Sequence, residues 1–289
     1  MDAMMWAVAF EASDRPVAQR GGPGRRSVKN VQPQVYLVSA PVLDYEEIEE
    51  YLKEVGGESW LERMYKEGDD DPQNLVEFAG RFCYRSWEPG LNPNVTRVRT
   101  EQKDYLDNIL ASQHGSVLEH AQFTFALHNV SRVFTHEAVR HRVGTAISQE
   151  SLRFVRLDDL RFWFPEWALE DEELYERALR LIGQMEDFQM WMAGHFGLDD
   201  EGRTFAHKKA KTSFMRRFAP EGLATGMVWS ANIRTLRHTI ETRTAEGAEE
   251  EIRIVFDRIG QIMRQECPLL FGDYEITDGG AWIPGWRKV

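Results

Sequence analysis

The stretch from Arg140 to Phe154, which reads RHRVGTAISQESLRF, constrains this chain more than any other feature. It holds Arg140, Arg142 and Arg153 within one short segment, and like charges that lie close together repel one another and resist burial. Arginine stays protonated, and its planar guanidinium binds phosphate through paired hydrogen bonds. The stretch therefore indicates a site for an anionic ligand, and the alternative is a solvated basic surface.

Length and composition indicate a folded protein with a sizeable core. The chain has 289 residues, of which 42% are hydrophobic and 28% charged. No apolar run approaches the ~20 residues that a membrane span needs, and the N-terminus lacks the order of a secretory signal. Cys83 and Cys267 are too few for a disulfide framework, and no Cys/His spacing is typical of zinc, so we expect no metal. We expect Cys83 in the core and the protein in the cytoplasm.

The charge is distributed unevenly along the chain. The net charge is −12, which argues against a general nucleic-acid binder. Residues 203 to 243 nevertheless carry nine lysines and arginines against only Glu221 and Glu241. Positive charge concentrated on an acidic protein predicts a focused pocket for small anions.

Periodicity predicts an α+β fold with an antiparallel or mixed sheet flanked by long helices in a single domain. Residues 1–32 are basic and poor in apolar residues, so we expect a flexible N-terminal tail before a domain at 33–289. Strands are expected at 34–40 and 122–129, where apolar and polar residues alternate. Caps at Asp44 and Ser131 predict that helices follow each of them.

Three further expectations concern other segments of the chain. Residues 59–73 are expected to form a surface excursion. The alternation from Ser151 to Leu157 predicts a strand with Ser151 and Arg153 on one face. The apolar positions of a long amphipathic helix are expected to lie in the core, and they are Leu174, Ala178, Leu181, Met185, Phe188 and Met192.

The arginine-rich stretch also resembles the signature of the flavin-dependent thymidylate synthases. Arg140-His141-Arg142 is followed by a spacer and then by Ser151-x-Arg153, which is the order of that signature. The usual spacer in the family has seven residues, whereas 143–150 has eight. The resemblance extends in ordered blocks from Leu75 to Phe271, and these blocks include His114-Gly115-Ser116, Arg216, Asn232-x-Arg234 and Arg243.

This resemblance implies a reaction, its cofactors and its partners. Enzymes of that family methylate dUMP to dTMP with FAD, with NADPH as reductant and methylenetetrahydrofolate as carbon donor, and reduced FAD delivers a hydride to the pyrimidine. They lack the cysteine nucleophile of conventional thymidylate synthases. The cofactor carries the redox step, and the protein supplies positioning and electrostatics. The implied partners are nucleotide and folate substrates and a homotetramer, with no nucleic acid and no membrane.

Individual residues acquire roles from the same resemblance. Arg243 is implied as the catalytic residue, because it would stabilise negative charge on the uracil ring as the ring ionises. The residues implied to bind dUMP are Glu137, Arg140, Gln149, Glu150, Ser151, Arg153, Arg216 and Arg243. The residues implied to bind FAD are His114, Ser116, Arg140, His141, Arg142, Gln149, Asn232, Arg234 and His238.

The chain departs from the family pattern at several of these positions. Glu137 stands where the family has glutamine, and Gln149 where it has glutamate, so the hydrogen-bond pattern must differ. Phe154 replaces a tyrosine, and Gly247 replaces a frequent histidine and predicts no flavin contact there. Two alternatives stay open: a catalytically impaired homologue that binds FAD or dUMP, and a flavin-dependent methyltransferase that acts on uracil in RNA. The acidic net charge argues against the second.

Overall fold

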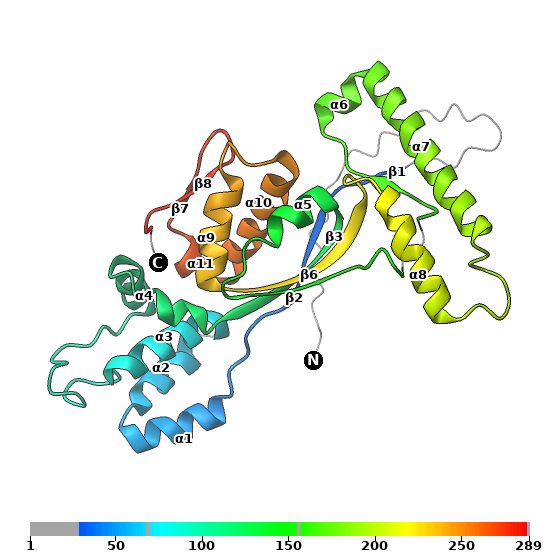
Figure 1. The fold of residues 1–289 in the computed structure, drawn as a ribbon. Helices are drawn as coiled ribbons and strands as arrows, with labels where there is room; N and C mark the ends of the chain where they lie inside the picture. The colour runs from blue at the N-terminus through cyan, green and yellow to red at the C-terminus, as the bar shows by residue number, and fades with distance from the viewer. Residues whose placement is uncertain (1–28, 68–69, 155–156, 288–289) are drawn as a thin grey trace.

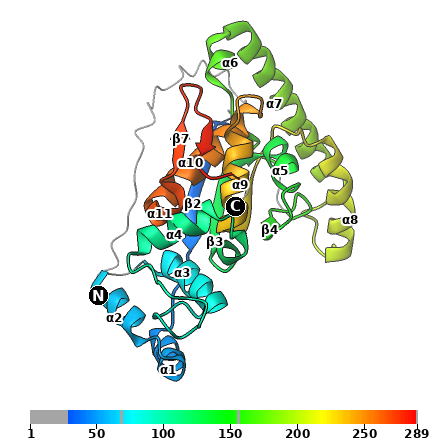
Figure 2. The same ribbon diagram turned by 90° about the vertical axis from the view of Figure 1, so that its left-hand side faces the viewer.

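The computed structural model describes residues 29–67, 70–154 and 157–287 and shows the expected α+β class (Figure 1). A central sheet carries helices on one face, and a helical group extends from each of its two ends (Figures 1 and 2). Most of the predicted tail, residues 1–28, lies outside the described residues. Its last part is ordered, because β1 (Lys29–Asn30) pairs in parallel with β5 (Arg161–Phe162).

The central sheet has the strand order β2–β3–β6–β4, and every neighbouring pair is antiparallel. Its strands are β2 (Gln34–Ser39), β3 (Gln122–Ser131), β6 (Ala224–Asn232) and β4 (Thr145–Gln149). The alternation predicted for β3 is confirmed, because Phe123, Phe125 and Leu127 are buried while His128 is exposed. The sheet therefore has one face that belongs to the core.

Three helices cover this inner face, and they are α5 (Arg132–Ala138), α9 (Ile233–Thr244) and α10 (Glu250–Glu266). Trp229 of β6 lies between Phe125 of β3 and Phe256 of α10, with ring centroids 6.2 Å and 5.5 Å away. Large aromatic side chains bury the most area per residue, so they supply much of the stability of this layer. Their packing holds α10 on the sheet, and Phe134 of α5 packs on Phe256 in turn.

The outer face of the sheet is open over part of its area. Tyr36 and Val38 of β2 and Val228 of β6 are exposed, although all three are apolar or aromatic. Monomeric proteins rarely leave large apolar patches in water, so such a face is typical of a surface that another protein covers.

A group of helices lies at one end of the sheet, and its first two members share a small core with Phe78 and Trp87, whereas the buried residues of its last member belong to the main core. Its members are α1 (Tyr45–Val55), α2 (Glu58–Glu67), α3 (Asp71–Tyr84) and α4 (Gln102–Ala111). The predicted start of α1 is confirmed, since the Asp44 side chain accepts a hydrogen bond from the Glu47 amide at 3.3 Å. The helix ends at Gly56, whose φ of 80° is left-handed and favours glycine.

Two expectations in this region are wrong. Residues 59–67 form most of α2 and residues 71–73 the start of α3 rather than a surface excursion, because Trp60, Leu61 and Met64 are buried against Leu52 and Trp87. The charged residues between them conceal this apolar stripe in the sequence. Cys83 is exposed, since α3 turns its buried face away from that position.

The opposite end of the sheet carries α6 (Glu166–Glu170), α7 (Glu172–His195), α8 (Phe205–Met215) and the short helix η2 (Arg216–Phe218). The helix α7 exists as predicted, but its expected core positions are only partly buried. Met192 is 1% exposed, whereas Leu181 is 53% and Phe188 is 40% exposed. The reason is that α7 projects from the body of the molecule, so that only the side facing α8, η2 and the segment around β5 is covered (Figures 1 and 2).

The predicted strand from Ser151 to Leu157 is also wrong. The strand is β4, which lies inside the spacer, and residues 152–154 form a turn after it. β4 pairs with β6 and forms the edge of the sheet, so the alternating residues that follow β4 have no neighbouring strand of this sheet to pair with. The remaining short elements are η1 (Gly115–Glu119), α11 (Pro268–Phe271), β7 (Tyr274–Ile276) and β8 (Trp282–Pro284).

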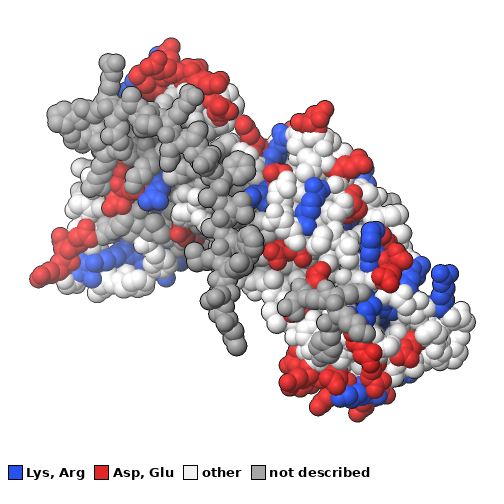
Figure 3. Space-filling view, turned by 180° about the vertical axis from the view of Figure 1, so that it is seen from behind, with Lys and Arg blue, Asp and Glu red and all other residues white. Residues whose placement is uncertain are grey.

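Charged side chains are mixed on the face of the molecule that Figure 3 shows. Acidic residues gather over α1 and over the start of α7, and lysines and arginines lie singly between them. Among the described residues, no helix is long and apolar enough to cross a membrane.

Candidate active site

The site begins with two strand-to-helix connections of the same kind. Ser131 ends β3 and caps α5 by accepting the Phe134 amide at 3.0 Å, and Asn232 ends β6 and caps α9 by accepting the Thr235 amide at 2.9 Å. Because β3 and β6 are antiparallel neighbours, the two helices begin at opposite ends of the strand pair. Their C-terminal ends therefore approach each other over the inner face of the sheet.

Arg243 in the last turn of α9 joins these two ends. Its Nε donates to His141 Nε2 at 2.6 Å and its Nη1 donates to Glu137 Oε2 at 2.7 Å, while Nη2 lies 3.3 Å from the Glu137 carbonyl oxygen. The Arg243 side chain is only 16% exposed. The candidate catalytic arginine is thus held in place by two other residues of the predicted site.

His141 at this junction is a neutral imidazole. Partial burial and the Arg243 charge, with His238 beside it, lower the pKa of His141 from its ordinary 6.5 to about 4. The His238 ring lies edge-on, with its centroid 6.1 Å from that of His141. Since Nε2 accepts from Arg243, the ring proton must sit on Nδ1. The charges of this cluster are therefore the positive charge of Arg243 and the negative charge of Glu137, which form an ion pair.

The turn after α5 exposes Arg140 and Arg142 on either side of His141. The turn is tied to α9, because the Thr235 hydroxyl donates to the Val143 carbonyl at 2.7 Å and the Asn232 amide to the Gly144 carbonyl at 3.2 Å. Gly144 has a φ of 67°, and a Cβ there would collide with the Asn232 side chain, so glycine is required. Neither arginine has an ion-pair partner among the described residues.

The residues that follow β4 belong to the sheet edge. Gln149 Nε2 donates to the Thr135 hydroxyl of α5 at 3.1 Å. The Glu150 carboxylate accepts from the Gly226 amide at 2.9 Å and from the Thr225 hydroxyl at 3.3 Å. Glu150 thus binds the neighbouring strand β6 within the chain.

Arg153 lies next to α8 rather than next to Arg243. The Thr212 hydroxyl of α8 donates to the Arg153 carbonyl at 2.9 Å, and Phe154 stacks on Phe205 with ring centroids 5.9 Å apart. Ser151 precedes this turn, with its hydroxyl oxygen 3.5 Å from the Arg153 amide. Arg216 follows α8 and is exposed. The two arginines implied for the nucleotide are therefore grouped with α8.

The residues implied for FAD extend from α9 to η1. Arg234 of α9 forms an ion pair with Glu119 at 2.6 Å, and both side chains are about half exposed. His114 precedes η1 and contacts Tyr84 edge-on, with centroids 5.6 Å apart, and Ser116 is exposed on η1. Glu119 was not predicted as the partner of Arg234, although it lies close to the His114 motif in the sequence.

Within one chain, then, the predicted residues form separate groups. Arg243, Glu137, His141 and His238 meet, and the turn with Arg140 and Arg142 adjoins them. Arg153 and Arg216 accompany α8, and no described contact joins them to Arg243. Thr212, which positions Arg153, was not predicted, because a helical threonine gives no signal in the sequence. Unpaired guanidiniums beside a preformed turn are suited to phosphate groups, so the arrangement is that of a nucleotide-binding α+β enzyme.

Comparison with known proteins assigns the family. The model of the Thy1 family, described as thymidylate synthase complementing protein, matches residues 65–269. The flavin-dependent thymidylate synthase of Corynebacterium aurimucosum is 33% identical over 213 residues, covering 73% of this chain and 83% of the relative. That of Mycobacteroides abscessus is 34% identical over 205 residues, covering 70% and 80%. The chain belongs to the flavin-dependent thymidylate synthase family, which confirms the predicted resemblance and the predicted class of FAD-dependent enzyme.

A solved structure with a similar fold is thymidylate synthase X from Helicobacter pylori with FAD and dUMP. It is 21% identical, with a TM-score of 0.49, and the match covers 70% of this chain and 93% of that one.

Proposed function

We propose that this enzyme converts dUMP to dTMP with methylenetetrahydrofolate as carbon donor and NADPH as reductant, in a reaction that depends on FAD. The observation that supports this most directly is the clamp of Arg243 between a neutral His141 and Glu137. A buried guanidinium with fixed partners is preorganised to stabilise negative charge that develops on a bound ring.

The FAD site in this proposal consists of the turn after α5 and the residues around it. When bound, FAD supplies the hydride that reduces the transferred carbon unit on the pyrimidine. Arg140 and Arg142 are exposed and form no ion pair with a described residue, so their guanidiniums can bind its phosphates, while Gly144 lets the turn pack closely on Asn232. The other residues of this site are His114, Ser116, His141, Gln149, Asn232, Arg234 and His238.

The dUMP site combines Arg243 with the arginines near α8. Arg243 would donate a hydrogen bond to the uracil oxygen. To do so, it breaks at least one of its two hydrogen bonds to Glu137. Arg153 and Arg216 would bind the phosphate, with Ser151, Gln149, Glu150 and Arg140 completing the site. Bidentate contacts from arginine favour phosphate by a few kcal/mol, about 1.5–3 for a charged hydrogen bond.

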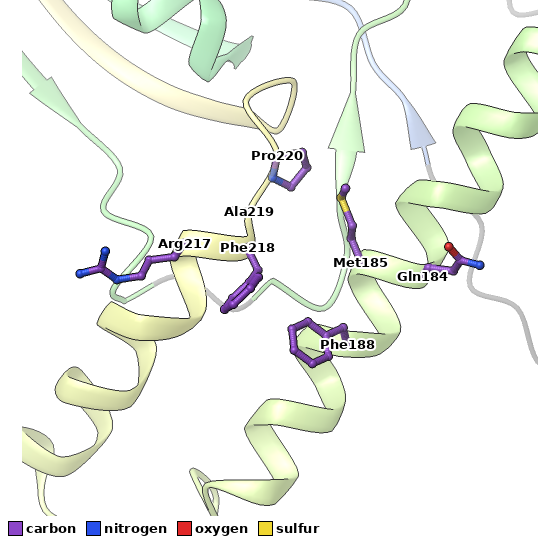
Figure 4. A pocket seen from close by; sticks show the side chains of 7 residues that line it. All are labelled: Gln184, Met185, Phe188, Arg217, Phe218, Ala219 and Pro220. Atoms are coloured by element: carbon purple, nitrogen blue, oxygen red, sulfur yellow. The ribbon is translucent and has the colours of Figure 1, made fainter.

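A homotetramer explains why these arginines are separate in one chain, since subunits can bring Arg153 of one to Arg243 of another. The support is exposed apolar surface that a subunit interface would cover. Phe188 of α7 stacks on Trp191 at 5.7 Å and meets Phe218 edge-on at 5.3 Å, and Phe188 and Phe218 border a cavity of about 350 Å³ (Figure 4). A cytoplasmic location, where the free thiols stay reduced, is part of the proposal.

The test is to purify the protein, record its flavin spectrum, and measure dTMP formation with and without methylenetetrahydrofolate. The proposal expects bound FAD and dTMP that depends on dUMP, the folate and NADPH. Bound flavin without any dTMP would instead identify a catalytically impaired homologue. Salt-sensitive binding of RNA would favour the RNA methyltransferase.

A further inference from the structure

A second cavity lies away from the Arg243 clamp, between α3, α4 and the loop that joins them. Its volume is about 280 Å³, and its walls include three arginines, which are Arg81, Arg97 and Arg99. None of the residues that line it is acidic. In a protein of net charge −12, arginines gathered around a cavity without a lining carboxylate favour an anionic ligand.

The loop around this cavity is built on one buried guanidinium. Arg81 is 1% exposed, and it donates to the Ser86 carbonyl and to the Arg99 carbonyl, both at 2.7 Å. Its Nε donates to Glu77 at 2.7 Å, and its guanidinium lies 4.4 Å above the Tyr105 ring. Both ends of the loop are therefore fixed by Arg81, whose charge Glu77 balances.

The other two arginines have no such partner. Arg97 and Arg99 are exposed at the cavity, and neither forms an ion pair with a described residue. The Ser86 hydroxyl, also in the wall, interacts with the Tyr105 phenol, which lines the cavity as well.

One wall of the cavity is aromatic and connects it to the site described above. Tyr84 and His114 contact each other edge-on there, and both line the cavity. His114 leads directly into η1, and η1 is tied to α9 by the ion pair of Glu119 with Arg234. A ligand could therefore reach from the flavin region past His114 to the two arginines.

From this geometry we infer that the cavity between Tyr84, Ser86, Arg97 and Arg99 binds the anionic end of an aromatic co-substrate. The inference rests on the proposed function and extends it. Two co-substrates of that reaction have this chemistry, because the pyridine nucleotide ends in phosphates and the folate ends in glutamate carboxylates. Arg97 and Arg99 bind the anion, Ser86 donates to it, and the aromatic pair packs against the ring system.

The experiment compares Arg97→Gln/Arg99→Gln with the control Arg177→Gln/Arg180→Gln. The control removes the same charge from two exposed arginines of α7 that form ion pairs with Glu173 and Glu176. Equilibrium dialysis measures the dissociation constants of NADP⁺ and of 5-formyltetrahydrofolate for each protein, and circular dichroism checks that the fold is kept. The two single variants replace the double variant if it does not fold.

The expected result is a dissociation constant at least tenfold higher for one of the two probes in the loop variant and unchanged in the control. The affected probe identifies whether phosphate or carboxylate is recognised. Affinities for both probes that stay within twofold of the wild type overturn the inference, as does a wild-type protein that binds neither probe. Because dialysis does not require turnover, failure to form dTMP contradicts the proposed function alone.

Discussion

Arg243 donates a 2.6 Å hydrogen bond to His141, although 102 positions separate the two residues in the sequence. Through this bond, Arg243 influences the protonation of His141, and His141 influences the orientation of Arg243. Partial burial and the charge of Arg243 lower the pKa of His141 and keep the ring neutral, and the neutral ring accepts the hydrogen bond that orients Arg243. Glu137 holds the other side of the guanidinium. The first four predictions below test this cluster and the helix and sheet layers that support it.

Arg243→Ala is expected to abolish dUMP-dependent oxidation of NADPH while FAD stays bound. The reason is that the variant removes the guanidinium that we propose to contact the uracil, whereas the arginines of the turn after α5 remain. Stopped-flow absorbance of NADPH and the flavin spectrum measure the two effects. Arg177→Ala, which removes an exposed arginine of α7, serves as the control. Full turnover in Arg243→Ala contradicts the assignment.

Glu137→Gln is expected to tighten the binding of dUMP about fivefold, equivalent to about 1 kcal/mol. In the wild type, Arg243 must give up a charge-assisted hydrogen bond to Glu137 before it binds the ligand, and an amide holds it less strongly. Both side chains are partly exposed, so the expected effect is modest. Isothermal titration with dUMP measures it. Weaker binding in the variant would show that Glu137 itself contacts the nucleotide.

His141 is expected to titrate near pH 4 and to return toward its ordinary pKa of 6.5 in Arg243→Gln. Because the folded protein binds this proton less readily than the unfolded chain, protonation favours unfolding. The contribution of His141 to stability is therefore present above about pH 6.5 and is lost as the pH falls toward 4. NMR of the imidazole carbons measures both pKa values. An unchanged pKa in the variant would contradict the role of Arg243.

Glu251→Gln is expected to reduce the pH dependence of stability between pH 5 and 8. The buried Glu251 carboxylate accepts a 2.6 Å hydrogen bond from the Ser131 amide, and desolvation raises the pKa of Glu251 to about 7. The folded protein thus binds this proton more readily than the unfolded chain, so ionisation between pH 4.5 and 7 lowers wild-type stability. Urea unfolding across that range measures the slope, with the exposed Glu54→Gln as control. Equal slopes would exclude Glu251 as the source.

A fifth prediction concerns the assembly. Phe188→Ser/Trp191→Ser is expected to dissociate the proposed tetramer and to lower dTMP formation at least tenfold, because both apolar side chains are exposed on α7. Sedimentation velocity measures the mass of the particle. Val42→Ser removes one exposed apolar residue elsewhere and should leave the mass unchanged. A wild-type monomer, or an unaltered mass in the double variant, contradicts this interface.

The sequence predicted those parts of the fold whose signals are local. The strand around Phe125 and the caps at Asp44 and Ser131 are as expected, because alternation and capping depend on neighbouring residues. The strand predicted from Ser151 failed because the sheet edge was already filled by β4, which only the pairing with β6 reveals. Phe188 was assigned to the core because it belongs to a series of apolar residues at helical spacing. Such a series does not show whether the apolar face of the helix packs on its own chain.

The site could be predicted in its residue types and only partly in its geometry. The resemblance named Glu137, His141 and Arg243, and the structure joins them. It did not reveal that Glu137 and His141 bind Arg243 itself, since side-chain contacts across 100 residues depend on how α5 and α9 end. The loop held by Arg81 gave no signal either, because its hydrogen bonds go to backbone carbonyls.

The pairing of β3 with β6 also determines the spacing of the reactive groups. Gln122 lies opposite Asn232, and Ser131 lies opposite Ala224, so each strand ends where the other begins. The distance between the two helix caps, Ser131 and Asn232, is consequently determined by the register of β3 with β6. A slip of one residue along this ladder would shift one helix against the other by about 3.3 Å, which exceeds the length of the bond between Arg243 and His141. Substitutions at the middle of the sheet, far from any ligand, can thus detune the alignment of the catalytic groups.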